Sequence, residues 1–174
     1  HDPENPDWEK RDLFLLSNGH CVPVQYATMA EAGYFHKTEL KTLRKFGTRL
    51  QGHPERQKLP GLETTSGPLG CGLSQAIGMA LGLRLQKSSR RVFVIMGDGE
   101  LDEGNIYEAL IEGWKHGLRN TWWIVDYNRQ SLDAVIREGL WERLESSFLA
   151  RAWRGISPGR DAAAARPHLN PRRG

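Results

Sequence analysis

The chain has 174 residues, of which 39% are hydrophobic and 26% charged, enough for one α/β domain with a buried core. No apolar run is long enough to span a bilayer, and no signal-peptide pattern opens the chain, so no membrane partner is expected. Two cysteines in unrelated contexts, Cys21 and Cys71, argue against a disulfide framework or a cysteine metal site and indicate a reduced, cytoplasmic setting.

The positive charge of the chain is concentrated at its end. Residues 151–174 hold six Arg and one Asp, and because the whole chain is +3, residues 1–150 carry −2. A nucleic-acid partner is not expected, since such a protein spreads its basic residues over a folded face. We predict an α/β domain at 1–150, incomplete at both ends, and the opening without Met is typical of a chain cut from a longer one. The Arg, Ala, Pro and Gly of 151–174 indicate either a disordered tail or a frameshift in GC-rich coding sequence.

The first half of the chain predicts two helices and a long loop. After the apolar run 13–16 and the turn "SNG", a helix is expected over about 20–33, closed near Gly33. A second is expected over 38–46, with Thr38 as its N-cap. The Gly- and Pro-rich stretch 47–72 is too irregular for a helix or strand, and a loop of that length is usually functional.

The second half predicts a parallel sheet. Helical spacing returns over 73–86, "RVFVIM" (91–96) and "TWWIVDY" (121–127) are buried-strand patterns, and 103–118 between them has the spacing of a helix. Strand, helix and strand joined by short links form a βαβ unit with a right-handed crossover. The predicted fold is therefore α/β, a doubly wound, mostly parallel sheet with flanking helices. Three tryptophans of this half are expected to pack in a core or an interface: Trp114, Trp122 and Trp123.

A candidate metal site lies where two of these strands end. Asp98, in "GDGELDEG" (97–104), follows the first strand of the unit and Asn128 follows the second, so one crossover brings both to the same edge. Their oxygens are hard ligands suited to Mg²⁺ or Ca²⁺, and a cation is needed there if a phosphate is to approach the carboxylate. An acidic helix start after a glycine turn is the structural alternative. The remaining acids of the motif are expected to open the following helix, where its dipole favours them: Glu100, Asp102 and Glu103.

The pairing of "GDG" with an Asn about thirty residues later resembles the fingerprint of the thiamine diphosphate-dependent enzymes. "HDPENPDWEKRDLFLLSNGH" (1–20), "GHPE" (52–55) and "GLETTSGPLGCG" (61–72) resemble a transketolase cofactor domain, in order and in register from about 1 to 148. The resemblance implies a truncated thiamine diphosphate-binding fold. It also implies a Mg²⁺ ion held by Asp98, by Asn128 and by the backbone carbonyl of Gln130.

Further site residues are implied by the same resemblance. His20 would lie near the cofactor diphosphate and His53 would face the substrate, although a purely local or a solvated role is the alternative for each. Gly99 would offer its N–H to the diphosphate. Glu103 would belong to a polar network at a dimer interface or be a solvated acid. The segment Gly67, Pro68 and Leu69 would line the aminopyrimidine side, unless it is a structural corner.

Two features depart from common transketolases. "NRQSLD" (128–133) and "GDGELDE" are closer to the decarboxylating component of pyruvate dehydrogenase, and Cys71 stands where many transketolases carry Gln. The leading hypothesis is the diphosphate-binding part of a transketolase-like enzyme that moves a two-carbon ketol unit between sugar phosphates. A 2-oxo acid decarboxylating component and a noncatalytic remnant are the alternatives.

The resemblance also implies partners. Related enzymes use a glutamate from a pyrimidine-binding domain, which must come from a second chain or a downstream domain. We therefore expect this chain to bind metal diphosphate weakly, to be inactive alone, and to form a homo-oligomer when complete.

Overall fold

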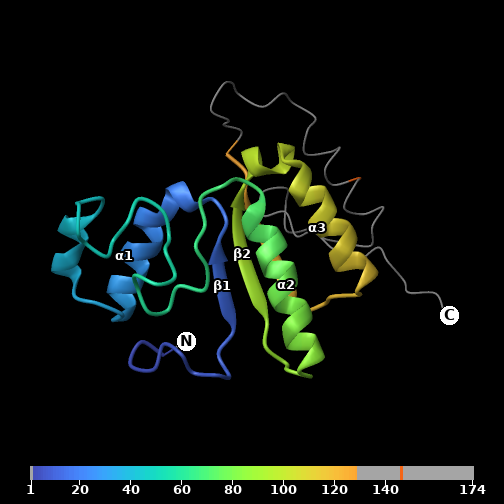
Figure 1. Ribbon diagram of the computed structural model, residues 1–174, viewed down its shortest axis with the longest axis horizontal. Coiled ribbons are helices and arrows are strands. Elements are labelled where there is room, and N and C mark those ends of the chain that lie inside the picture. Colours follow the sequence, from blue (N-terminus) through green and yellow to red (C-terminus); the bar gives the residue numbers. More distant parts are fainter. Residues whose placement is uncertain (1, 129–145, 147–174) are drawn as a thin grey trace, which may run out of the picture. The chain divides into compact units, whose positions relative to one another are not determined.

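A computed structural model describes residues 2–128 and residue 146 of the chain (Figure 1). The chain divides into two compact units, residues 1–136 and 137–174, and every helix and strand given below belongs to the first. Gln130 and the predicted tail at 151–174 lie outside the described residues. Across the described part, no helix is both long and apolar enough to cross a membrane.

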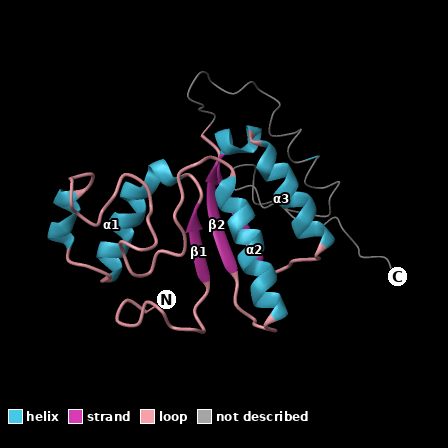
Figure 2. Ribbon diagram, in the orientation of Figure 1, coloured by secondary structure: helices cyan, strands magenta, loops and turns pink. Residues whose placement is uncertain are grey.

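The sheet consists, in the described part of the chain, of three parallel strands in the order β1-β2-β3. Its strands are β1 (Leu13–Leu16), β2 (Val92–Gly97) and β3 (Thr121–Asp126), drawn in magenta in Figure 2. In the register, Leu16 pairs with Ile95 and Gly97 pairs with Asp126. Because all three strands run in one direction, the residues that follow them emerge at the same edge of the sheet.

One face of the sheet is covered by α2 (Cys71–Leu85) and α3 (Gly104–Lys115), which lie side by side in Figure 1. The alternation of β2 follows from this cover, since Val92, Val94 and Met96 are fully buried while the residues between them are only half-buried. α3 joins β2 to the parallel strand β3, so the predicted βαβ unit is confirmed.

Among the described residues, the cover of the other face lies at one end. There α1 (Val22–Ala32) and the loop after it form a core cluster that includes Leu16 and against which Ile95 packs. Further along the same face, Phe93 stacks on Trp122 with ring centroids 6.2 Å apart, and Trp122 is 50% exposed. The expectation of a core position is therefore wrong for Trp122 and for Trp114, which is 59% exposed. An interface position stays a prediction for both.

The first predicted helix is confirmed, and the second is wrong in type. α1 ends at Gly33, which adopts φ +95° as the left-handed cap expected of a glycine. Residues Lys37–Thr42 form a 3₁₀ helix instead of an α-helix over 38–46. Its N-cap is His36, whose ring accepts a hydrogen bond from the Thr38 N–H at 3.3 Å, so Thr38 is not the cap.

The reason lies in the packing of two leucines. Leu40, in the 3₁₀ helix, and Leu43, its C-cap, both pack against the α1 cluster, and a short 3₁₀ segment is enough to place them there. Leu43 then turns to an extended conformation, which ends the helix. The long segment from there to α2, residues 43–70, contains no helix or strand, in keeping with the predicted loop.

Candidate metal and diphosphate site

Three strand tips meet at the carboxyl edge of the sheet. Beyond β1 the chain continues through Ser17, whose N–H donates to the carbonyl of Ile95 at 2.7 Å and so fixes this tip against β2. Asp98 is one residue beyond the rung at which Gly97 pairs with Asp126, and Asn128 is two residues beyond the same rung. The structure therefore places Asp98 and Asn128 at neighbouring tips of one edge, as the sequence predicts.

The two side chains have different surroundings. Asp98 is only 1% exposed, and its Oδ1 accepts a hydrogen bond from the Gly99 N–H at 3.0 Å. Asn128 is exposed, and its Nδ2 donates to Asp126 Oδ2 at 3.4 Å. A carboxylate and an amide oxygen at neighbouring strand tips are hard donors, so the chemistry of these two side chains fits a Mg²⁺ ion.

Part of the implied ligand set is outside the described structure. The third ligand of the resemblance is the carbonyl of Gln130, which lies beyond the described residues. Within residues 2–128 and residue 146, no group of three or more His, Cys, Asp or Glu is placed to hold a metal ion.

The glycine-rich loop is seated directly on the tip of β1. Ser66 is buried, and its Oγ donates to the carbonyl of Leu16 at 2.6 Å. Gly19 lies so close that a Cβ on it would stand 3.0 Å from the Gly67 nitrogen. The close approach explains why a glycine occupies position 19. It also brings the segment before His20 against the start of Gly67, Pro68 and Leu69.

His53 joins the same group. A Cβ built on Gly67 would lie 3.4 Å from the His53 ring, so this imidazole stands over the glycine-rich loop. Tyr26 is buried, which raises the pKa of its phenol, and its hydroxyl donates to the His53 carbonyl at 3.3 Å. Both His20 and His53 are exposed, so either ring can reach a bound molecule. The structure thus gathers the predicted loop residues, while their roles toward a cofactor stay predictions.

The acids of the "GDGELDEG" motif do not share one role. α3 begins at Gly104, and Asp102 and Glu103 are exposed in the turn before it. Glu100 is 1% exposed and sits in the 3₁₀ helix Asp98–Asp102, so the prediction that it opens the following helix is wrong. It accepts three hydrogen bonds, from Ser17, Gly70 and Gly97. Sequence reasoning missed this residue and Ser17, since only the tertiary fold brings them together.

The thiol nearest this edge is not activated. Cys21 and Cys71 are both free, and burial, followed by the charges of Asp126 and Glu100, raises the pKa of the Cys21 thiol. Asn18 is 3% exposed, and its Nδ2 donates to Cys21 Sγ at 3.4 Å. A thiol with a raised pKa stays protonated at neutral pH and is a poor nucleophile.

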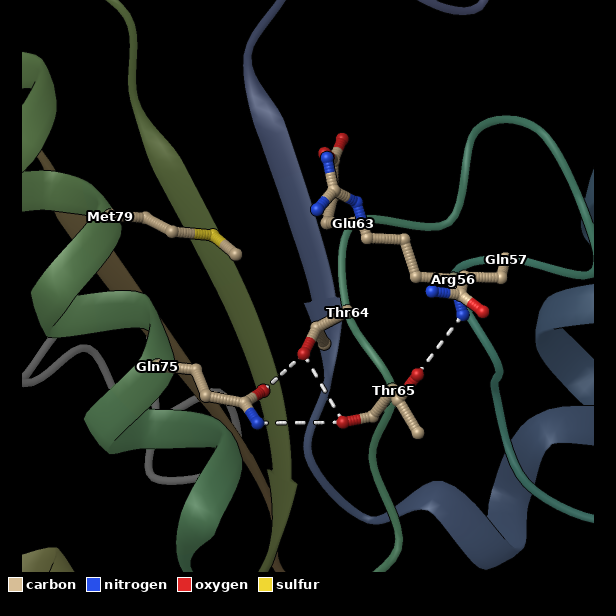
Figure 3. Close-up of a pocket in the computed structure, with 7 residues that line it drawn as sticks. All are labelled: Arg56, Gln57, Glu63, Thr64, Thr65, Gln75 and Met79. Carbon is tan, nitrogen blue, oxygen red and sulfur yellow. Dashed lines mark hydrogen bonds between the residues drawn. The ribbon is translucent and has the colours of Figure 1, made fainter.

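A cavity of about 460 Å³ lies elsewhere, between the loop and α2 (Figure 3). The Gln75 side chain crosses from α2 to the loop, where its Nε2 donates to the Thr65 carbonyl at 3.4 Å and its Oε1 accepts from Thr64. The residues lining this cavity include none of the predicted site residues: Arg56, Gln57, Glu63, Thr64, Thr65, Gln75 and Met79.

A parallel α/β domain whose strand tips present a buried Asp, an Asn and a glycine-rich loop is of the class that binds a metal diphosphate. Residues 1–167 match the family described as "Transketolase, thiamine diphosphate binding domain", and the chain belongs to that family. Thiamine diphosphate with a divalent metal is the cofactor of the family. The family match extends past residue 148, where the motif resemblance ends.

The curated relatives are transketolases. The chain is 38% identical over 152 residues to a subunit of the apulose-4-phosphate transketolase of Phocaeicola vulgatus, covering 87% of this chain and 54% of that protein. It is 39% identical over 153 residues to a 6-deoxy-6-sulfo-D-fructose transketolase subunit of Clostridium sp., covering 87% of this chain and 56% of that protein. The chain thus spans about half the length of these relatives.

Solved structures give the same fold. The transketolase of Leishmania mexicana superposes with a TM-score of 0.79 at 34% identity, over 87% of this chain and 24% of that one. The transketolase of Campylobacter jejuni superposes with a TM-score of 0.81 at 31% identity, over 87% and 25% of the respective chains. The predicted fold, a thiamine diphosphate-binding α/β domain present here in part, is confirmed.

Proposed function

We propose that this chain forms the diphosphate- and metal-binding part of an enzyme that transfers a two-carbon ketol unit between sugar phosphates. The observation that carries the proposal is the placement of Asp98 and Asn128 at the tips of the paired strands β2 and β3. The curated relatives support ketol transfer, because both are named as transketolases of a particular sugar. The alternative, decarboxylation of a 2-oxo acid, has no comparable support.

In this proposal the cation is held by Asp98, Asn128 and the carbonyl of Gln130. When bound, thiamine diphosphate supplies the electron sink that the reaction needs. The protein's own task is to hold and orient the cofactor. His20 donates a hydrogen bond to the diphosphate, and the Gly99 N–H can do the same. His53 faces the substrate and bonds its oxygen atoms. The aminopyrimidine side is lined by Gly67, Pro68 and Leu69.

We further propose that a second chain or domain completes the site by supplying a glutamate on the pyrimidine side. Two observations support this: the chain spans about half of its curated relatives, and both of these are themselves named as subunits of a transketolase. The purified chain is then expected to give no ketol transfer alone, and the complete enzyme is expected to be a homo-oligomer. A cytoplasmic location is also proposed, supported by the two free thiols.

Calorimetric titration of the purified chain with thiamine diphosphate tests the proposal. Heat of binding is expected with Mg²⁺ present and is expected to vanish in EDTA, because the diphosphate approaches Asp98 only through a cation. Thiamine without phosphates is the matched ligand and should not bind in either buffer. Binding that ignores EDTA would contradict the metal assignment. No binding at millimolar cofactor would favour the noncatalytic remnant.

A further inference from the structure

We propose that Glu100 is a positioning residue, whose buried carboxylate locks together the three segments that present the cofactor-binding groups. The inference rests on the proposed function and gives Glu100 a role in place of the helix-opening one that the sequence predicted; the family resemblance assigns it none. It starts from the hydrogen bonds that this one side chain accepts.

The carboxylate is bonded on both oxygens. Oε1 accepts from the Ser17 hydroxyl at 2.6 Å and from the Gly70 N–H at 2.9 Å. Oε2 accepts from the Gly97 N–H at 2.9 Å. Glu100 is 1% exposed, and Ser17 is fully buried. Burying a carboxylate is costly unless donors replace its water shell, so these three donors are what allows a charge at this position.

The three donors belong to three different parts of the site. Ser17 is the first residue beyond β1 and leads to Gly19 and His20. Gly70 directly follows the segment Gly67, Pro68 and Leu69 and is the N-cap of α2. Gly97 is the last residue of β2 and precedes Asp98. One side chain therefore fixes, at the same time, the backbone that carries the imidazole, the glycine-rich loop and the metal ligand.

The surrounding geometry fits this role. Gly70 has φ +78°, a conformation that glycine adopts readily, and in it the Gly70 N–H reaches Glu100. Gly72 packs closely against Ser17, since a Cβ built on Gly72 would stand only 2.4 Å from the Ser17 Oγ. Gly72 therefore limits the position of Ser17, and the Glu100 carboxylate is the acceptor that all three donors share.

Replacing Glu100 with glutamine keeps the size of the side chain and removes one acceptor. In either orientation of the amide, its NH₂ group faces an N–H or O–H donor that was bonded to an oxygen. With NH₂ in place of Oε2 the Gly97 amide loses its acceptor, and in the other orientation Ser17 and Gly70 lose theirs. At least one segment of the site is therefore released in Glu100→Gln, while the fold keeps its shape.

The experiment compares Glu100→Gln with the matched control Glu108→Gln, an exposed glutamate on α3. Amide hydrogen exchange is measured at Gly70, at Gly97 and at Val94, a buried β2 residue that reports global opening. The affinity for Mg²⁺–thiamine diphosphate is measured by calorimetry. We expect exchange at Gly70 or Gly97 to rise about tenfold more than at Val94, and cofactor affinity to fall about tenfold, in Glu100→Gln only.

The outcomes separate this inference from the proposed function. Exchange at Gly70 and Gly97 that rises only in step with Val94 would show a general loss of stability and overturn the inference. Released amides with cofactor affinity within about twofold of the parent would also overturn it. If the parent chain itself binds no cofactor, the proposed function fails, and the exchange rates alone then decide whether Glu100 ties the three segments together.

Discussion

The residues at the sheet edge show which parts of the site can be predicted from a sequence pattern. Asp98 and Asn128 are predictable because strand direction and one crossover suffice to place them at one edge. The role of Glu100 is not predictable, because its hydrogen-bond donors are 83, 30 and 3 residues away in the sequence and no local motif indicates them. A pattern of neighbouring acids suggests a solvated helix start, and burial gives one of them a different role.

Gly72 is a residue-scale test of the packing behind this edge. An added Cβ would stand 2.5 Å from the Ser17 Cβ and 2.7 Å from its Cα, so the backbone that follows β1 must shift to admit it. We expect Gly72→Ala to lower the free energy of unfolding by about 1–3 kcal/mol, as overpacking does. Urea unfolding followed by circular dichroism measures the change.

The control for this prediction is on the same helix. A Cβ on Gly78 meets nothing within 4 Å. Gly78→Ala is therefore expected to raise the free energy of unfolding by about 0.5–1 kcal/mol through helix propensity. Equal stability of the Gly72→Ala and Gly78→Ala variants would show that α2 is not pressed against Ser17 as described.

At the scale of elements, strands and long helices are predicted well because their apolar spacing is a strong local signal. The 3₁₀ helix Lys37–Thr42 is mispredicted, since the contacts of Leu40 and Leu43 with the α1 cluster are tertiary and leave no local signal in the sequence. The start of α2 at Cys71 is two residues earlier than expected, because Gly70 caps it in a left-handed conformation that the sequence alone does not reveal.

The ion pair at the start of β1 and β2 gives a prediction about how stability depends on pH. Arg91 donates to Asp12 from its N–H and from Nη2, both at 2.7 Å. Burial acts to raise the pKa of Asp12, but the bonds and charge of Arg91 outweigh it and hold the pKa below its ordinary value of 3.8. The ion pair therefore stabilises the fold above that value, and its contribution is lost as the pH falls through the lower folded pKa.

We expect Asp12→Asn to cost about 0.5–1 kcal/mol of unfolding free energy at pH 7, a modest value because both side chains are partly exposed. The cost should shrink as the pH is lowered from 5 toward 2. Urea unfolding across this pH range measures it, with the exposed Glu9→Gln variant as the control. A cost for Asp12→Asn that does not change with pH would mean that the charge of Asp12 is not what stabilises the strand pair.

At the scale of the whole molecule, the family can be predicted and the substrate cannot. Several motifs in fixed order identify the thiamine diphosphate-binding domain, and the match over residues 1–167 confirms it. The choice among sugar phosphates depends on groups that hold the substrate, and within the described part of the chain only His53 is proposed for that task. The half-covered sheet face, where Phe14 is 38% and Ile124 is 47% exposed, is a second property that emerges only in three dimensions.

The central claim is that Asp98 and Asn128 hold one cation together. Electron paramagnetic resonance of Mn²⁺, used in place of Mg²⁺, measures the free ion as the chain is titrated in the presence of thiamine diphosphate. We expect Asp98→Ala and Asn128→Ala each to weaken Mn²⁺ binding at least about tenfold, and the double variant to lose less than the two losses combined. The exposed Asp102→Ala variant should bind as the parent does. Undiminished Mn²⁺ binding by Asp98→Ala, or losses that simply add in the double variant, would contradict the claim.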